Sequence, residues 1–347
     1  MPEALSRVAV PDRLVPIRIT STQEVGNVMK CLGAVIFLSA MLPAGGVLAQ
    51  KTYPERPVRV IVPFAPGGGT DIVGRIVAKQ MTEVLGQSVM VDNRPGAGGS
   101  IGEEMIARAT PDGYTIGMVS GYGTNAAVYK LNYDPVNDIQ AIISIGDSGM
   151  IVSLHPEVPI KSLQEFIAYA KANPGKLNYS SSGTGAITHL ATELLNLSAA
   201  IKTTHIPFKG TGPALTALLS KEVHFLLGSM PATLPHIQGG RLRGVAVTTP
   251  KRLNALKDLP AIAEVVPGYR AVITYGLIGP KGLPDEAVRR WNTEVNKILK
   301  TGEMKERLAK DGIEPVGGAP EVFHDVIRRD VEQWKRVVRE AKLNFSS

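Results

Sequence analysis

The strongest constraint on the fold is an order that repeats along the chain: a short β-branched run, a loop rich in glycine, serine or threonine, and then an amphipathic helix. The first example reads VRVIV (58–62), PFAPGGGTD (63–71) and a helical pattern over 72–85. Apolar residues that recur every three or four positions predict a helix, whereas short continuous apolar runs predict buried strands. This alternation favours an α/β fold with parallel sheets covered by helices on both faces.

Further strands and helices follow in the same order. A strand over 88–92, a helix over 99–109 and a strand over 114–119 complete a β-α-β-α-β unit. Two long amphipathic helical patterns stand near the end of the sequence, at 285–300 and 321–341. Their apolar stripes predict that both helices pack against the rest of the protein.

The pattern changes character near 147–152 and returns near 270–275, which indicates two crossings between two α/β lobes. These crossings are also the expected hinges. The sequence therefore predicts a first lobe of residues 50–150 and 272–347, and a second lobe of residues 151–271.

Residues 29–50, MKCLGAVIFLSAMLPAGGVLAQ, have the build of a secretory signal peptide: Lys30, an apolar stretch, and small residues before Gln50. The apolar stretch is shorter than the roughly 20 residues that a transmembrane helix needs. Residues 1–28 are polar and precede a complete signal, so we expect Met29 to be the true start. The predictions are a leader and signal peptide over 1–49, with the signal at 29–49, and a periplasmic mature protein.

The composition argues against nucleic-acid binding despite the basic balance. The formal net charge is +7 and the pI is about 9.4, but Lys and Arg are scattered along the chain. Aromatic residues make up only 5% of the sequence, which leaves little surface for base stacking. We therefore expect no nucleic-acid partner.

Four loops share the design of strand, small-residue loop and helix, and together they predict an anion site. In α/β sheets, ligands bind where such loops gather at the carboxyl ends of the strands. Each loop offers unpaired backbone N–H groups at a helix N-terminus, which carries a partial positive charge and attracts anions. The loops are PFAPGGGTD (63–71), SGYGTN (120–125), SSSGTGAITH (180–189) and FKGTGPAL (208–215).

The same loops do not fit the common cofactor motifs. A Walker A loop needs Gly-Lys-Ser/Thr, which occurs nowhere, and GTGAIT has two glycines of a dinucleotide loop but not the third. His189 and Glu193 stand one helical turn apart, but no second pair of metal ligands lies near them in the sequence. We expect neither a cofactor nor a metal.

A hydrolase remains an alternative at this point. Ser180, Ser181 and Ser182 lie close to His189 in sequence, which is compatible with a Ser–His pair. The nucleophile elbow G-x-S-x-G is absent, however, and polar loop residues that bind a ligand explain these serines more simply. Asp71 could act as an acid or base, but its position is typical of a helix cap, with ligand contact possible alongside.

Seven landmarks together resemble the Bug (TctC-type) extracytoplasmic solute receptors of tripartite tricarboxylate transporters. The resemblance spans residues 53–343, nearly the whole predicted mature chain, and its landmarks are YPERPVRVIVPFAPGGGTDIVGR, VDNRPGAGGSIG, PDGYT, YAKANPGKLNYSSSGTG, HIPFKGTGPALT, LPHIQGGRLRGVAVTT and EPVGGAPEVF. The resemblance implies a two-lobed, type II-like periplasmic-binding-protein fold, with each lobe a mainly parallel sheet flanked by helices. It also implies a monomeric receptor that is not an enzyme.

The resemblance implies a ligand class and partners. The ligand would be a small organic anion, namely a di- or tricarboxylate or an aromatic carboxylate, held by backbone and hydroxyl groups. The partners would be the membrane subunits of the transporter, or alternatively a membrane signalling kinase. Carried over by motif, the implied ligand-binding residues are Phe64, Pro66, Gly67, Gly68, Asp71, Ser120, Thr124, Ser181, Gly183, Thr184, His189, Lys209, Gly210, Gly212 and Ser229.

One departure from the family pattern bears on the ligand. Many members carry an Asp in the stretch before P-x-x-LPHI, whereas this chain has Gly228 followed by Ser229. An Asp there would suit an amino group or hydroxyl of the ligand. Its absence disfavours an amino-acid ligand and leaves room for a bulkier or a wholly anionic one.

Overall fold

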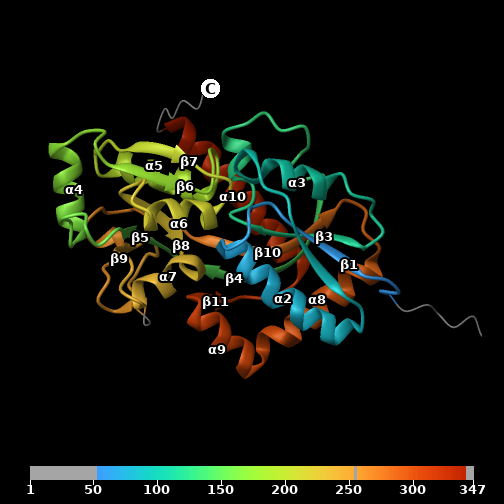
Figure 1. Ribbon diagram of the computed structural model, residues 1–347. Helices are drawn as coiled ribbons and strands as arrows, with labels where there is room; N and C mark the ends of the chain where they lie inside the picture. The colour runs from blue at the N-terminus through green and yellow to red at the C-terminus, as the bar shows by residue number, and fades with distance from the viewer. Residues whose placement is uncertain (1–52, 254–255, 341–347) are drawn as a thin grey trace, which may run out of the picture. The chain divides into compact units, whose positions relative to one another are not determined.

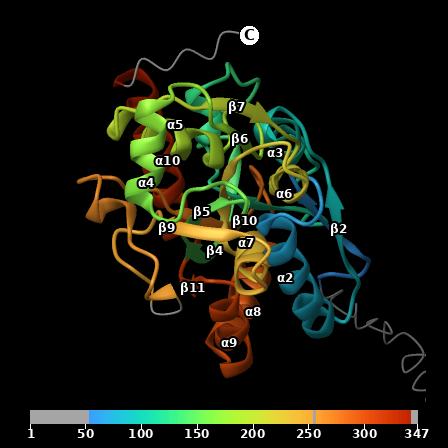
Figure 2. The ribbon, with the colours of Figure 1, turned by 60° about the vertical axis from the view of Figure 1, so that its left-hand side comes forward.

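The computed structural model describes residues 53–253 and 256–340, and the predicted leader and signal peptide lie outside these residues. Within the described ranges, the strands form one six-stranded and one five-stranded sheet, both flanked by helices (Figures 1 and 2). The α/β class that the repeating order predicts is therefore confirmed.

The first sheet has the strand order β11-β4-β10-β3-β1-β2. Strand β1, next to the edge strand β2, is parallel to both neighbours, and its residues are almost entirely buried, as the continuous VRVIV run predicts. The strands are β1 (Val58–Val62), β2 (Val89–Asn93), β3 (Thr115–Ser120), β4 (Ile139–Ser148), β10 (Ile273–Pro280) and β11 (Ile313–Pro315).

The second sheet has the order β7-β6-β8-β5-β9. All five residues of β5 and of β8 are buried, so these two central strands form the middle of its core. The strands are β5 (Met150–Leu154), β6 (Asn178–Ser181), β7 (Thr204–Pro207), β8 (Phe225–Ser229) and β9 (Arg243–Val247).

Both sheets are mixed, which refines the expectation of mainly parallel sheets. Strand β10 is antiparallel to β3 and β4, and β11 is antiparallel to β4. In the second sheet β5 is antiparallel to β8 and β9, while β6 is parallel to β7 and β8. The antiparallel strands follow from the chain's path, because β4 leads into β5 through Gly149 alone and β10 returns from the second sheet to the first.

The helices cover both sheets. Helix α2 packs on β1, β2 and β3, α8 and α10 pack on β4, and α5, α6 and α7 pack on β8 (Figures 1 and 2). Helix α2 also contacts α7. The helices are α2 (Gly69–Leu85), α3 (Ser100–Ala107), α4 (Leu163–Ala172), α5 (Ile187–Ser198), α6 (Thr211–Leu219), α7 (Met230–Gln238), α8 (Asp285–Lys300), α9 (Gly302–Lys310) and α10 (Pro320–Glu340), with short 3₁₀ turns η1 (Ala97–Gly99), η2 (Thr124–Ala127) and η4 (Ile262–Glu264).

Two differences from the predicted elements are informative. Helix α2 begins at Gly69 rather than at residue 72, because the Asp71 carboxylate accepts the Gly67 N–H and extends the first turn into the glycines. The structure also has α9, which the sequence analysis did not predict, and Thr301 caps it by accepting the Met304 N–H.

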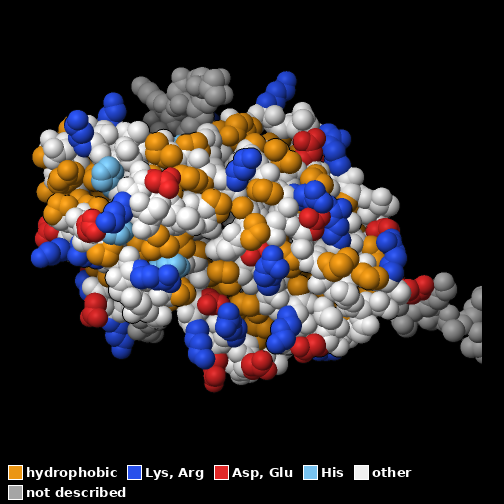
Figure 3. Space-filling model, viewed as in Figure 1, with side chains coloured by type: hydrophobic (Ala, Val, Ile, Leu, Met, Phe, Trp, Pro, Cys, Tyr) orange, Lys and Arg blue, Asp and Glu red, His pale blue; other side chains and the backbone are white. Residues whose placement is uncertain are grey.

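Two further observations concern the length of the helices and the charges on the surface. Across the described part of the chain, we find no helix that has both the length and the apolar character to span a bilayer. On the face shown in Figure 3, Lys and Arg side chains are interspersed with Asp and Glu over several elements. The predicted division into two lobes stays a prediction.

Candidate functional site

A small enclosed cavity lies where the two sheets' loops meet. Its free volume is about 10 Å³, which is room for about one water molecule. Residues of all four predicted loops contribute to its wall, as do β8 and β10. The lining residues are Phe64, Gly68, Gly69, Thr70, Ser120, Ser182, Ile187, Thr188, Thr211, Ser229, Ile273 and Tyr275.

Among the described elements, four helices begin at this wall. Gly69 starts α2, Ile187 starts α5 and Thr211 starts α6, while Ser229 is the N-cap of α7. Each of these helices begins without a side-chain cap hydrogen bond in the described structure. Because the first N–H groups of a helix have no partner inside it, the wall presents bare donors and the positive ends of four peptide dipoles.

Hydroxyl groups complete the wall. The side chains of Thr70 and Ser120 share a hydrogen bond of 2.6 Å, and those of Ser182 and Thr188 share one of 2.8 Å. Each pair leaves acceptor or donor capacity for a further partner.

Two buried hydroxyls face the cavity without a partner. Ser229 is 3% exposed and Tyr275 is fully buried, yet neither oxygen makes a hydrogen bond of ordinary geometry within the described structure. Burial raises the pKa of Tyr275, and the nearby Ser229 hydroxyl lowers it only in part, so Tyr275 stays a neutral donor. Buried polar atoms are costly when unpaired, so this pair points to a polar occupant.

The wall has no charged side chain that could attract or repel a ligand. None of its twelve residues, all of them in the described ranges, is Lys, Arg, His, Asp or Glu. The positive potential therefore comes from the helix N-termini, which is the arrangement that binds phosphates and carboxylates at many helix starts.

Four of the predicted ligand-binding residues line the cavity: Phe64, Gly68, Ser120 and Ser229. Several wall residues were not predicted, although each of them is next to a predicted residue in the same glycine-rich or serine-rich loop. Tyr275 was missed for another reason, since it lies inside strand β10 and no loop motif marks it.

Asp71 lies behind the wall and supports it. Its carboxylate accepts hydrogen bonds from the Gly67 N–H, from Asn93 and from Arg75, all at 3.0 Å. Burial alone would raise the pKa of Asp71, but these hydrogen bonds and the Arg75 charge outweigh it and lower the pKa below its ordinary value. Asp71 therefore stabilises the glycine loop from the first turn of α2, while Gly68 and not Asp71 occupies the N-cap position.

The predicted residues Ser181 and His189 also lie behind the wall. The Ser181 hydroxyl pairs with His205 Nε2 at 2.6 Å, and His189 Nδ1 accepts the Gly185 N–H at 3.1 Å. The two imidazole rings stack with centroids 3.9 Å apart. Burial, together with His205, lowers the pKa of His189 to about 3, and burial lowers the pKa of His205 to about 4.

This arrangement does not form the predicted pair of Ser181 or Ser182 with His189, and the Ser181–His205 pair that does form is buried. Ser181 is fully buried and bonds His205 instead of His189, while Ser182 bonds Thr188. The predicted nucleophiles are thus held by other groups, and a substrate has no access to Ser181. In the described residues no cluster of three or more His, Cys, Asp or Glu could hold a metal ion.

The remaining predicted residues lie outside the cavity lining. All of them except Thr124 are at contacts between loops of the two sheets. The Tyr129 hydroxyl donates to the Thr184 carbonyl oxygen, and the Gly183 backbone packs against Gly98. The Thr124 hydroxyl donates to the Gly121 carbonyl oxygen, which lies just before η2. Four more residues lie at a second contact between the loops, outside the cavity lining: Pro66, Gly67, Gly210 and Gly212. Lys209 contributes its carbonyl oxygen to that contact, while its side chain is exposed.

The chain is similar to known proteins in both sequence and structure. The family model described as "Tripartite tricarboxylate transporter family receptor" matches residues 73–343. The chain belongs to this receptor family. It is therefore a solute receptor of the TctC/Bug type and not an enzyme, and the family comprises periplasmic binding proteins.

Three solved structures show how closely this receptor follows its relatives. Rpa4515 of R. palustris, solved with adipate, is 35% identical with a TM-score of 0.81, over 84% of this chain and 98% of that one. The periplasmic binding protein BugD is 34% identical with a TM-score of 0.81, over 84% and 99%. MatC of Rhodopseudomonas palustris, solved with bound malate, is 30% identical with a TM-score of 0.79, over 82% and 100%.

Proposed function

We propose that this receptor captures a small dicarboxylate-type anion in the cavity between its two sheets and delivers it to the membrane subunits of a tripartite tricarboxylate transporter. One observation carries the proposal: four helix N-termini and two unpartnered buried hydroxyls converge on a single wall that has no charged side chain. Two similar structures were solved with adipate and with malate, which are dicarboxylates. They support the same ligand class here.

Capture proceeds by closure of two lobes, residues 50–150 with 272–347 and residues 151–271. The free volume of about 10 Å³ is too small for a dicarboxylate, so the ligand enters an open form and the wall adjusts around it. Closure excludes water, and charge-assisted hydrogen bonds from N–H and O–H groups strengthen as the local dielectric falls. The crossings near 147–152 and 270–275 serve as hinges.

The finer assignments follow from the same proposal. The receptor acts as a monomer in the periplasm after cleavage of the signal at 29–49. Its ligand lacks an amino group, because the wall contains no carboxylate side chain that could pair with one. The ligand contacts are Phe64, Gly68, Ser120 and Ser229, joined by the other polar wall residues.

The test is a ligand panel on protein that has been unfolded and refolded to remove any ligand from the expression host. Adipate and malate should raise the melting temperature, because a ligand at about 100 times its Kd adds about 2.7 kcal/mol to the unfolding free energy. Aspartate, which has an amino group, and butyrate, which has one carboxylate, are the matched controls. If no di- or tricarboxylate or aromatic carboxylate shifts the melting curve, the proposed ligand class is wrong.

A further inference from the structure

Two segments from opposite sheets meet backbone to backbone beside the cavity. Residues 64–68 lead into α2, and residues 209–212 lead into α6. The Ala65 N–H donates a hydrogen bond of 2.9 Å to the carbonyl oxygen of Lys209. We call these two segments together the glycine seam.

The seam leaves no room for a side chain at its closest points. A methyl group on Gly212 would clash with the Pro66 carbonyl oxygen, and one on Gly210 would lie 2.9 Å from the Ala65 nitrogen. A methyl group on Gly68, by contrast, would lie 3.4 Å from the Thr211 Cβ, which is close to an ordinary contact. The main chains of the two sides are therefore nearest at Gly210 and Gly212.

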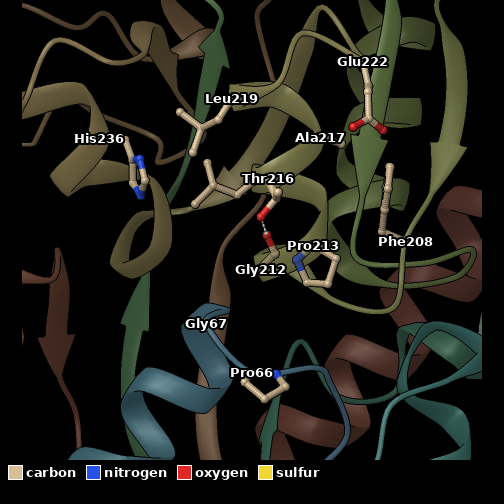
Figure 4. A pocket seen from close by; sticks show the side chains of 11 residues that line it. Pro66, Gly67, Phe208, Gly212, Pro213, Thr216, Ala217, Leu219, Glu222 and His236 are labelled. Carbon is tan, nitrogen blue, oxygen red and sulfur yellow. Dashed lines mark hydrogen bonds between the residues drawn. The ribbon is translucent and has the colours of Figure 1, made fainter.

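The seam separates the cavity from an outer groove. In Figure 4, Pro66 and Gly67 face Gly212 and Pro213 across this groove, which has a volume of about 600 Å³. On the inner side, the adjacent residues Gly68 and Thr211 belong to the cavity wall. The contact of the two main chains therefore lies between residues that line the groove and residues that line the cavity.

We propose that the glycine seam is a latch that holds the receptor closed, and that Gly212 is a positioning residue for ligand retention rather than a ligand contact. The proposal rests on the proposed function, since it assigns the contact to ligand capture. Because main chains make the contact, side-chain rotamers cannot absorb a change there. Any side chain at position 212 pushes Pro66 away and holds the two sides apart.

Gly212 is well suited to a test. It lies in the first turn of α6, and its backbone conformation is open to residues other than glycine. Alanine is the better helix former, so a loss of affinity in Gly212→Ala cannot be ascribed to a weaker helix. Gly302 is the matched control, because it lies in the first turn of α9 and a methyl group there meets nothing within 4 Å.

The first measurement is calorimetric titration of the wild type, Gly212→Ala and Gly302→Ala with adipate and with malate. We expect Gly212→Ala to bind about tenfold more weakly, with faster dissociation, and Gly302→Ala to match the wild type. Equal affinities in all three proteins would overturn the latch. Absence of binding by the wild type would instead count against the proposed ligand class, and the latch is then decided without ligand.

The ligand-free measurement is hydrogen exchange of the Ala65 amide, which bonds only across the seam among the contacts of the described residues. Exchange should be severalfold faster in Gly212→Ala than in the wild type and Gly302→Ala, and equal rates would overturn the latch. If Gly212→Ala does not fold, Ala65→Pro removes the same hydrogen bond by deleting its donor, and it should show the same loss of affinity. Unchanged affinity in Ala65→Pro would again contradict the proposal.

Discussion

The loops 63–71 and 180–189 face the same cavity, but different chemistry holds each of them in place. The first is fixed by an ion pair, in which the buried Asp71 accepts hydrogen bonds from Gly67 and from Arg75. The second is fixed by neutral groups, since Ser181 pairs with His205, and His189 accepts the Gly185 N–H.

The two loops therefore respond to protons in different pH ranges. The lowered pKa of Asp71 keeps the first loop intact until the pH falls below the ordinary range of an aspartate. The two histidines are held neutral by burial, so the second loop begins to lose stability as soon as the pH falls below the ordinary histidine value. As the pH falls, the loop 180–189 should therefore lose stability before the loop 63–71 does.

The largest expected effect comes from acidification. The folded-state pKa of His189 is about 3 against an ordinary 6.5, so the unfolded chain binds the proton first. The stability that His189 contributes is therefore complete above pH 6.5 and is lost as the pH falls. At pH 4 the loss is about 3 kcal/mol for His189 alone. Chemical denaturation at pH 7, 5.5 and 4 measures it.

The control for this prediction is His189→Asn, which keeps an acceptor for the Gly185 N–H but cannot be protonated. The variant should lose less stability between pH 7 and pH 4 than the wild type. If both proteins show the same pH dependence, the acid sensitivity does not come from His189.

A second prediction concerns Glu103 in α3, which packs on the first sheet, and the stability that is lost as the pH rises towards neutral. Glu103 is buried and accepts hydrogen bonds from Asn125 and Tyr133. Burial raises its pKa to about 7, against the opposing effect of those two hydrogen bonds. The folded state thus holds the proton more tightly, and stability is lost as the pH rises from about 4.5 to 7, by about 3 kcal/mol.

Glu103→Gln should remove this loss, because the amide keeps an acceptor and never ionises. The variant should be more stable than the wild type at pH 8 and nearly equal to it at pH 4.5, as measured by urea unfolding. A variant less stable than the wild type at pH 8 would contradict the prediction.

A third prediction compares the two partners of the ion pair. Asp71→Ala leaves the Gly67 N–H and the Asn93 amide without an acceptor and should cost about 2 kcal/mol. Arg75→Met should cost less than about 1 kcal/mol, since the Arg75 side chain is 54% exposed. Equal losses in the two variants would show that the charge, and not the cap, holds the loop.

The smallest effects are expected at the two unpartnered hydroxyls, which come from different sheets. Tyr275→Phe and Ser229→Ala each remove a buried oxygen without a partner, so each should stabilise the ligand-free protein by up to about 1 kcal/mol. Each should also weaken binding of the captured anion, by about tenfold for a lost hydrogen bond. A variant that binds as tightly as the wild type excludes that hydroxyl as a ligand contact.

Much of the fold was predictable because it depends on local patterns. The buried VRVIV strand, the helices over 285–300 and 321–341 and the four glycine loops all follow from periodicity and small-residue runs. The antiparallel courses of β5 and β10 could not be predicted, since strand direction depends on how the chain returns from one sheet to the other.

The site was predictable as a place but not in its details. Loop motifs pointed to the region where the structure has this cavity, yet they could not separate a residue that faces the cavity, such as Ser120, from one that faces away, such as Ser181. That distinction depends on packing across the two sheets. Tyr275 shows the same limit, because its neighbours in the cavity are distant in sequence.

The helix starts around the cavity have a consequence for transport under changing conditions. Peptide groups have no proton to gain or lose in the physiological range, and the one ionisable side chain in the wall, Tyr275, stays neutral. The attraction that the receptor exerts on its cargo is therefore constant across the pH values that a bacterial envelope meets. A pH dependence of capture must therefore come from the ionisation of the cargo or from protonation of the buried histidines behind the loop 180–189.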